Sequence, residues 1–216
     1  MLIDDVGLWC QIDRAAADGG PALFLDRDGV IVVDTHYLGR AADVRLLDGA
    51  AAAIARCNAL RVPVVVVTNQ AGIARGYYDW EGFQAVQATL SRALAAHGAH
   101  LDAVLACAYH AEGCGRLRVA SHSWRKPNPG MIVAAAGRMN VDLSRSWIVG
   151  DSISDLAAGL AAGLAGGTLL ATASSAQQQA RSLATRRFVV ETAPGLGDAV
   201  AALIERGILT EPRPVA

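Results

Sequence analysis

Three short polar segments of the sequence each begin where an apolar run ends. They are residues 26–30 (Asp-Arg-Asp-Gly-Val), 68–70 (Thr-Asn-Gln) and 150–151 (Gly-Asp). Carboxylates that share one crevice repel each other and raise each other's pKa unless a cation offsets their charge, and hard oxygen ligands suit Mg²⁺. If the three segments meet, Asp26, Asp28 and Asp151 therefore predict a magnesium site that handles phosphoryl groups.

Lys126 is a fourth candidate, because it is the single lysine among 19 basic residues. It stands in an Arg-Lys-Pro run near the end of the stretch 109–128, which has neither helical nor strand periodicity and is long enough to be a functional loop. A compact ammonium and a planar guanidinium are not interchangeable. We interpret Lys126 as a point charge that the same crevice requires, with chance as the alternative.

Apolar runs that alternate with Ala-rich helical patterns must position these residues. We predict strands at 22–25, 62–67, 103–106, 147–149, 168–170 and 188–190, and helices at 48–60, 80–97, 130–139 and 155–163. Alternation of this kind predicts a three-layer α/β/α sandwich on a mainly parallel, Rossmann-like sheet. The carboxyl ends of parallel strands face one crevice, so the polar segments can converge there.

Length and composition limit the class of protein. The chain has 216 residues, a net charge of -1, 53% hydrophobic and 18% charged residues. These values favour an N-terminal leader at 1–20 and a single domain at 21–216 with a loop insertion at 109–128. Without a basic run, a long apolar run or a signal sequence, we expect a cytoplasmic monomer that binds neither nucleic acid nor membrane.

Together the motifs resemble the aspartate-nucleophile phosphatases of the haloacid dehalogenase superfamily. The four motifs of that superfamily match residues 26–30, residues 68–69, Lys126, and residues 150–151 with Asp155, in the expected order. The resemblance covers roughly residues 21–190. No long insertion follows the first motif, so the resemblance predicts no large cap domain.

The resemblance implies a role for each matching residue. Asp26 is the nucleophile that forms an aspartyl-phosphate, and Asp28 is the general acid and base. Mg²⁺ is held by Asp26, the main-chain carbonyl of Asp28, and Asp151. Thr68 and Asn69 donate hydrogen bonds to the transferring phosphoryl group, Lys126 adds its charge, and Arg125 grips the substrate. In an extended segment, Arg27 would point away from the site.

Within the superfamily, residues 24–31, 68–77 and 125–131 resemble the heptose-1,7-bisphosphate 7-phosphatases. A small sugar phosphate is therefore the expected partner, and removal of the 7-phosphate is the expected reaction. Histidinol-phosphate phosphatases share much of the pattern, so that activity or a broad sugar phosphatase is an alternative. A phosphosugar-binding or zinc-stabilised interaction protein without catalysis is the alternative from another class.

Each motif also has an ordinary structural interpretation when it is taken alone. Asp-x-Asp-Gly after an apolar run can be a turn, and Thr68 with Asn69 can cap a helix. Asp151 can cap the following helix, and Asp155 can complement the helix dipole. The four motifs in register favour the catalytic interpretation.

The loop at 109–128 departs from the pattern of the heptose bisphosphate phosphatases, many of which carry a zinc loop with four closely spaced ligands. Zinc is a possible second metal here, held by Cys107, His110, Cys114 and His122 with shifted spacing. In the alternative, the metal is lost, and packing of Tyr109 and Trp124 holds the loop.

Overall fold

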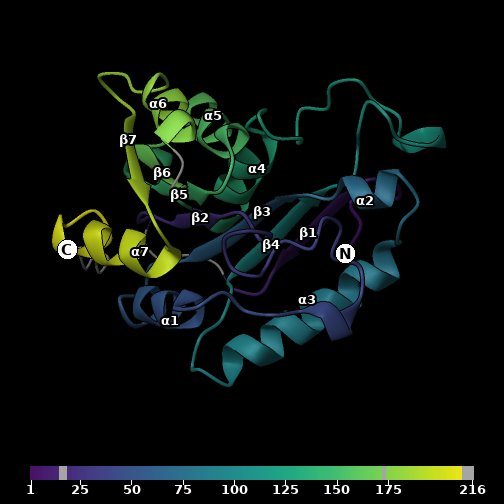
Figure 1. Ribbon diagram of the computed structural model, residues 1–216, viewed down its shortest axis with the longest axis horizontal. Coiled ribbons are helices and arrows are strands. Elements are labelled where there is room, and N and C mark those ends of the chain that lie inside the picture. Colours follow the sequence, from purple (N-terminus) through teal and green to yellow (C-terminus); the bar gives the residue numbers. More distant parts are fainter. Residues whose placement is uncertain (15–18, 172–173, 211–216) are drawn as a thin grey trace.

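The computed structural model of the protein describes residues 1–14, 19–171 and 174–210. A seven-stranded sheet with the strand order β1-β4-β3-β2-β5-β6-β7 forms its centre (Figure 1). The strands are β1 (Leu8–Ile12), β2 (Leu23–Leu25), β3 (Val64–Asn69), β4 (Ala103–Cys107), β5 (Trp147–Gly150), β6 (Gly166–Leu170) and β7 (Val189–Ala193). β1 pairs antiparallel with β4, and the other neighbouring pairs are parallel. The predicted parallel α/β architecture is confirmed.

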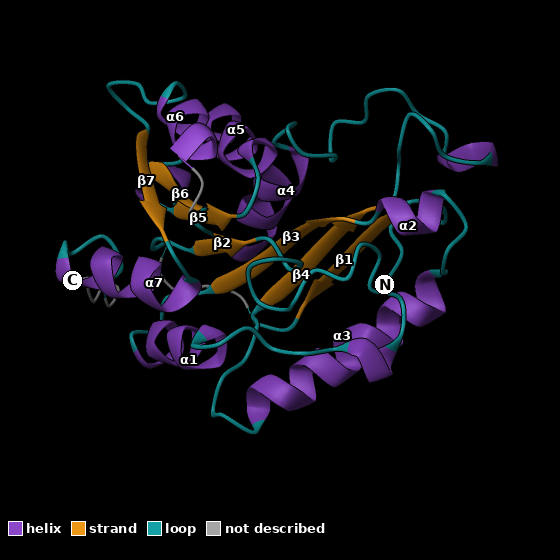
Figure 2. Ribbon diagram, viewed as in Figure 1, coloured by secondary structure: helices purple, strands orange, loops and turns teal. Residues whose placement is uncertain are grey.

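Helices cover both faces of this sheet (Figure 2). One face carries α1 (Ala50–Ala59), α3 (Trp80–Ala95) and α7 (Leu196–Glu205), and the other carries α4 (Gly130–Met139), α5 (Ile153–Ala162) and α6 (Ser174–Arg181). Short helical turns are α2 (Ala71–Ala74), η1 (Ala41–Asp43), η2 (Gly115–Leu117) and η3 (Leu143–Arg145). The three predicted layers are therefore present.

The core consists of two hydrophobic clusters, one on each face of the sheet. The first packs Ile54 of α1, Phe83 of α3 and Val200 of α7 against the sheet, and the second packs Leu156 of α5 and other side chains of α4 to α6. The run Val64 to Val67 of β3 is completely buried, with its side chains divided between the two clusters. A strand that is apolar on both sides is typical of a sheet covered on both faces.

The first strand was not predicted. Residues Leu8–Ile12 lie within the expected leader, yet they form β1 and pair with β4 from Leu8 opposite Cys107 to Ile12 opposite Ala103. Trp9 of β1 stacks on Trp80 with ring centroids 5.9 Å apart. This part of residues 1–20 thus belongs to the sheet, whereas residues 15–18 lie outside the described residues.

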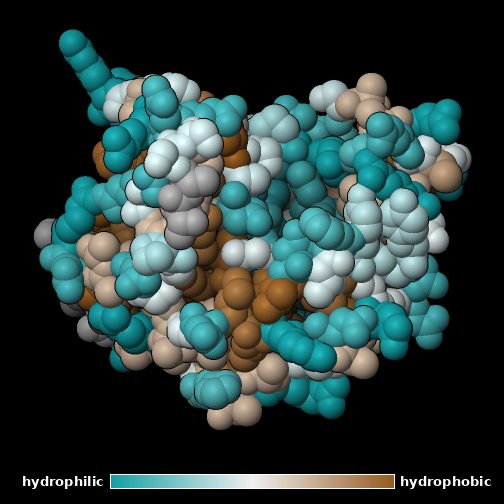
Figure 3. Space-filling view, in the orientation of Figure 1, coloured by the Kyte–Doolittle hydropathy of each residue, from teal (hydrophilic) through white to brown (hydrophobic). Residues whose placement is uncertain are grey.

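The segments that follow β2 and β3 begin at the first two polar motifs and contain only turns and short helices. Between β2 and α1 the described chain forms turns and η1, and between β3 and α3 it forms α2. No separate cap domain interrupts the described chain at either place, as expected. Among the described ranges, no helix has the length and apolar character needed to cross a membrane. The surface is mostly hydrophilic in the view of Figure 3, with a hydrophobic area near its middle.

Candidate active site

The polar segments of the sequence meet at the carboxyl edge of the sheet. β2 lies between β3 and β5 and pairs in parallel with both. Asp26 follows β2, Thr68 and Asn69 end β3, and Asp151 follows β5. These four residues and Asp28 line one cavity of roughly 400 Å³. Strand order therefore brings together residues that are far apart in the sequence.

Lys126 reaches the same place from the loop before α4. Its Nζ lies 2.9 Å from Asp26 Oδ2 and 2.6 Å from Asp155 Oδ1, and the residue is 3% exposed. Burial disfavours the ammonium, but the charges of Asp155 and Asp26 outweigh burial and raise the pKa of Lys126 above its usual value. The lysine is thus a permanent point charge between two carboxylates.

Asn69 fixes the main chain that carries this lysine. Its Oδ1 accepts a hydrogen bond from the Lys126 amide at 3.1 Å, and its Nδ2 donates to the Lys126 carbonyl at 3.1 Å. The sequence predicted Asn69 as a donor to a phosphoryl group. In the structure the amide oxygen and one Nδ2 hydrogen bond to the main chain of Lys126. Asn69 also lines the cavity and has a second Nδ2 hydrogen, so its role as a phosphoryl donor stays a prediction.

Three carboxylates crowd one side of the cavity. Asp26, Asp151 and Asp155 each offer an oxygen, and these oxygens lie within 4.8 Å of one another. Burial raises the pKa of Asp26. The positive charge of Lys126 lowers this pKa, and the negative charges of Asp155 and Asp28 raise it. Reduced hydration and the charge of Asp155 raise the pKa of Asp151 to about 6. Three acidic groups against one lysine leave a negative excess on hard oxygen donors, which fits a divalent cation such as Mg²⁺.

Asp155 links this cluster to the start of α5. Its Oδ2 accepts hydrogen bonds from the Ser152 amide at 3.0 Å and the Ser152 hydroxyl at 2.7 Å, which leaves Oδ1 for Lys126. Gly150 makes room for this carboxylate, because a Cβ there would overlap the Asp155 side chain. Asp155 thus lies in the first turn of α5, where it was expected to complement the helix dipole, and it also contacts Lys126 at the cavity.

Gly29 allows the first motif to turn tightly beside Asp151. Its φ is +74°, in the left-handed region that glycine adopts readily, and a Cβ at this position would collide with the Asp151 carboxylate. The glycine of the Asp-x-Asp-Gly motif is thus required both by its backbone conformation and by the close approach of the two segments.

Arg27 points away from the cavity, as expected, but its guanidinium also contacts Asp28, which an extended segment would not allow. The motif turns after β2, and the guanidinium returns to Asp28, with Nε 3.1 Å from Oδ1 and Nη2 2.9 Å from Oδ2. Arg27 is fully buried, whereas the Asp28 side chain is 24% exposed and lines the cavity. Alternation did not predict the contact with Asp28 because residues 26–28 leave the strand conformation after Leu25.

Gln70 connects Arg27 to Thr68. Gln70 Oε1 accepts from Arg27 Nη2 at 3.2 Å and from the Tyr78 hydroxyl at 2.5 Å, and Gln70 Nε2 donates to Thr68 Oγ1 at 2.8 Å. Because Gln70 supplies the hydrogen on one side of the Thr68 oxygen, the Thr68 hydroxyl can direct its own hydrogen into the cavity. Thr68 is thereby oriented as a donor.

The predicted substrate residue Arg125 is not among the residues that line the cavity. Its Nη1 donates to the Tyr109 carbonyl at 3.3 Å, and burial, together with the nearby charge of Arg75, lowers its pKa. Arg75 itself pairs with Glu112 at 2.6 Å and with the Tyr37 hydroxyl. Tyr37 lines the cavity, so the two arginines lie near its edge.

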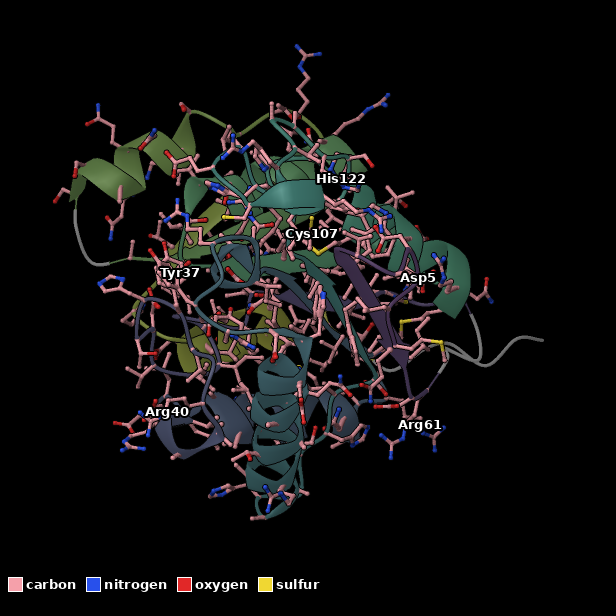
Figure 4. The ribbon with its side chains drawn as sticks, turned by 90° about the vertical axis from the view of Figure 1, so that its right-hand side faces the viewer. Asp5, Tyr37, Arg40, Arg61, Cys107 and His122 are labelled. Atoms are coloured by element: carbon pink, nitrogen blue, oxygen red, sulfur yellow. The ribbon has the colours of Figure 1, made fainter. Side chains whose placement is uncertain are left out.

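The proposed zinc ligands are not brought together. Among the described residues, the three aspartates above form the group of metal-ligating side chains, and Cys107, His110, Cys114 and His122 do not form another. Cys107, labelled with His122 in Figure 4, is buried in the core, whereas Cys114 is exposed. The Nδ1 atoms of His110 and His122 accept main-chain hydrogen bonds.

Tyr109 packs within this loop, as the alternative interpretation expects, but its ring partner is His122 rather than Trp124. The ring of Tyr109 stacks on His122 with centroids 4.3 Å apart and an interplanar angle of 17°. The Tyr109 hydroxyl donates to Asp4 Oδ2 at 2.6 Å, and Asp4 Oδ1 accepts from the main-chain amides of Val6, Gly7 and Leu8, the last of which begins β1. The amino-terminal segment thus supports the loop at the place where the zinc ligands were expected.

Two residues of the site, Arg27 and Gln70, had no assigned role in the sequence analysis. The available signal was an arginine between two acids directly after a buried strand, followed by a glutamine directly after the Thr-Asn pair of the next strand. Side chains at such positions face crowded space, where a polar group is retained only with partners.

Comparison with known proteins identifies the family. A profile described as HAD-hydrolase-like matches residues 123–196. The D-glycero-beta-D-manno-heptose-1,7-bisphosphate 7-phosphatase of Mesorhizobium japonicum is 52% identical over 138 residues, 64% of this chain and 64% of the relative. The match thus spans slightly less than two thirds of that relative. The phosphatase of the same name from Photorhabdus laumondii is 33% identical over 166 residues, 77% of this chain and 88% of the relative.

Solved structures agree with this relationship. A protein of Mesorhizobium loti described as a HAD-like phosphatase has a TM-score of 0.85 and 42% identity, with 99% of both chains covered. The D,D-heptose 1,7-bisphosphate phosphatase of B. bronchiseptica, solved with magnesium and phosphate, has a TM-score of 0.74 and 31% identity, and the match covers 86% of this chain and 99% of that one. The chain therefore belongs to the haloacid dehalogenase-like hydrolases, in the branch that contains the heptose-bisphosphate 7-phosphatases.

Proposed function

We propose that the protein is a Mg²⁺-dependent phosphomonoesterase that removes the 7-phosphate of D-glycero-D-manno-heptose 1,7-bisphosphate. The observation that carries this proposal is the arrangement of Asp26, with Lys126 Nζ 2.9 Å away and the Asp151 and Asp155 oxygens within 4.8 Å. An acidic nucleophile between one fixed ammonium and a cation-binding cluster suits attack on phosphorus. The names of the relatives supply the substrate.

Asp26 and Asp28 would carry the two chemical steps. A carboxylate oxygen of Asp26 attacks phosphorus while the bond from phosphorus to the sugar oxygen breaks, and Asp28 gives that oxygen its proton. Asp28, then ionised, takes a proton from water as the water oxygen attacks the aspartyl-phosphate. The bond between phosphorus and Asp26 breaks, inorganic phosphate leaves, and both acids return to their starting states.

The other residues of the cavity would stabilise the negative charge on the phosphoryl group during these steps. Lys126 faces the nucleophile, and Thr68 presents its hydroxyl hydrogen to the phosphoryl oxygens. Mg²⁺ held by Asp26, the Asp28 main-chain carbonyl and Asp151 would supply the positive charge that lets an anionic nucleophile approach an anionic group. Arg125 and Arg75, near the edge of the cavity, are suited to the distal phosphate or the sugar hydroxyls.

Phosphate release with and without Mg²⁺ tests the mechanism. Asp26→Asn removes the nucleophile and should abolish release, whereas Asp198→Asn, an exposed acid in the first turn of α7, should behave like the parent. Release by Asp26→Asn at the parent rate would refute the aspartyl-phosphate mechanism. Trapping of a phosphorylated chain in the parent, absent from Asp26→Asn, is the direct readout.

Relative rates test the substrate. We expect kcat/KM for the heptose bisphosphate to exceed that for histidinol phosphate and for simple sugar phosphates, because discrimination is a difference in transition-state binding. Comparable values would assign a broad sugar phosphatase instead. Both anomers of the heptose bisphosphate belong in this comparison.

We further propose that the protein acts as a cytoplasmic monomer without zinc. The four cysteines are free, and the zinc candidates are separated in the described part of the chain. Size-exclusion chromatography with light scattering measures the oligomeric state, and metal analysis of freshly purified protein measures zinc.

A further inference from the structure

Arg27 is a fully buried cation directly behind the cavity. Its Nε and Nη2 contact the two oxygens of Asp28, and its Nη1 donates to Gln87 Oε1 at 3.3 Å. The Phe83 ring lies 5.5 Å from the guanidinium carbon. Burial of a cation is unfavourable unless the cation is paired and hydrogen-bonded. The carboxylate that pairs with this cation is Asp28, whose side chain lines the cavity.

We propose that Arg27 is a positioning residue, whose guanidinium fork sets the direction in which the Asp28 carboxyl group faces the oxygen of the leaving sugar. This inference rests on the proposed function, in which Asp28 is the general acid. Arg27 itself touches no reacting atom, because it is fully buried and is not among the residues that line the cavity.

The two-point contact carries the first part of the argument. A carboxyl group on one methylene can turn about two bonds, and a single charge next to it would leave the outer rotation free. Contacts of 3.1 Å to Oδ1 and 2.9 Å to Oδ2 fix both oxygens of Asp28 at once. Proton transfer needs hydrogen-bond reach, and a misplacement of about 1 Å can cost about 100-fold in rate.

The anchoring of Arg27 carries the second part. Gln70 Oε1 at 3.2 Å and the Leu38 carbonyl at 3.5 Å accept from Nη2, the nitrogen that also contacts Asp28, and Gln87 Oε1 accepts from Nη1. These acceptors are neutral, so they hold the group in place without competing as ion-pair partners. Gln70 also donates to Thr68 at 2.8 Å, so one buried network orients both the acid and a phosphoryl donor.

Substrates with different leaving groups separate positioning of the acid from general damage. A sugar hydroxyl is a poor leaving group that needs a proton, whereas p-nitrophenolate leaves with little help. We compare kcat/KM for the heptose bisphosphate and for p-nitrophenyl phosphate, because this parameter ends at the first irreversible step and excludes hydrolysis of the intermediate.

Arg27→Met should lower kcat/KM about 100-fold for the heptose bisphosphate and less than about fivefold for p-nitrophenyl phosphate. Arg27→Lys, which keeps the charge and loses the fork, should rescue part of the first loss. Arg92→Met is the matched control, because Arg92 is exposed on α3 and bonds only to groups of its own helix among the described contacts. It should match the parent with both substrates.

A second pair of variants tests the anchor. Gln87→Leu removes an acceptor of the guanidinium, and Gln84→Leu removes an exposed glutamine one turn earlier on α3. We expect Gln87→Leu to shift the ratio of the two kcat/KM values about threefold in the direction of Arg27→Met. Gln84→Leu should leave the ratio unchanged.

The outcomes distinguish this inference from the proposed function. An equal loss, or no loss, with both substrates in folded Arg27→Met overturns the positioning role. If that variant fails to fold, a parent-like ratio in Arg27→Lys overturns it. Parent-like activity of Asp28→Asn on the heptose bisphosphate would instead refute the acid role of Asp28. In the Asp28→Asn background, Arg27→Lys should no longer change the ratio, because coupled residues are not additive.

Discussion

The ammonium of Lys126 is enclosed by Asp26 and Asp155 at 2.9 and 2.6 Å, with almost no exposure to solvent. A guanidinium is wider and planar, so it cannot occupy the same gap although it keeps the charge. We predict that Lys126→Arg lowers kcat by at least about 100-fold. Steady-state phosphate release measures this loss, and thermal unfolding shows whether the variant remains folded.

Lys126→Met is the companion variant, since it removes the charge and approximates the length. Similar losses in both variants would indicate that the position of the charge matters as much as its presence. Near-parent turnover in Lys126→Arg would mean that the lone lysine of an arginine-rich chain is a coincidence.

Asp151 lacks a basic partner among the described ion pairs, and its pKa is raised to about 6. A carboxyl group with a raised pKa binds more protons when folded than when unfolded, so stability falls as pH rises from the usual value toward about 6. In Asp151→Asn, the loss of stability with rising pH should be smaller. We expect the metal-free variant to melt at a higher temperature than the metal-free parent above about pH 7.

Magnesium should restore the stability that is lost when Asp151 ionises, and it should do so in the parent but not in Asp151→Asn. Mg²⁺ binding needs ionised carboxylates. The rise in melting temperature on addition of Mg²⁺ should therefore be larger near pH 8 than near pH 5. Asp151→Asn should lose the rise at both pH values. An equal rise in the variant would remove Asp151 from the metal site.

At the scale of elements, the loop before α4 depends on its contact with the segment before β1. Tyr109 donates to Asp4 at 2.6 Å, and the hydrogen bond, together with three main-chain amides, lowers the pKa of Asp4 despite partial burial. Tyr109→Phe should lower the free energy of unfolding by about 1 kcal/mol. Chemical denaturation measures it, with Tyr77→Phe on the exposed surface as the control.

A metal in this loop would contradict that account. Zinc near one equivalent in freshly purified protein, lost on Cys107→Ser, would show that the ligands gather in solution. In that case Tyr109→Phe should have little effect, because the metal would hold the loop. The two results therefore separate packing from coordination.

Strand β1 shields the edge of β4 along five paired residues. Without it, β4 would present unpaired main-chain groups, which other chains can bind. We predict that a chain lacking residues 1–12 is less stable and aggregates. Light scattering during expression and refolding measures this outcome, and a monodisperse truncated protein with parent-like melting would refute it. Trp9→Ala, which keeps the strand but removes its ring from Trp80 and Phe83, is the milder variant.

At the scale of the whole molecule, the sequence analysis predicted six strands and four long helices near their observed positions. The apolar runs were informative because a sheet covered on both faces leaves a continuous hydrophobic signal, as in β3. β1 was missed because its five residues mix Trp, Cys and Gln without alternation. Its pairing with β4 depends on residues about 95 positions away, which no local pattern encodes.

The same limit explains which parts of the active site were predicted. Asp26, Asp28, Thr68 and Asp151 follow strands, so topology alone brings them to one cavity. Contacts that depend on side-chain direction after a turn were not accessible, and the return of Arg27 to Asp28 is the main example. The contact of the Asn69 amide with the Lys126 main chain, across 57 positions, was not predicted for the same reason.

The burial of Lys126 also has a consequence for handling the protein. Reagents that acylate amines, such as succinimidyl dyes and cross-linkers, find no other lysine side chain in the sequence, and this one is 3% exposed. Lysine therefore offers no accessible group for coupling to a surface or a dye. Thiol chemistry offers a better handle, because Cys114 is exposed whereas Cys10, Cys57 and Cys107 are buried. A maleimide probe would thus report on the loop from a single position.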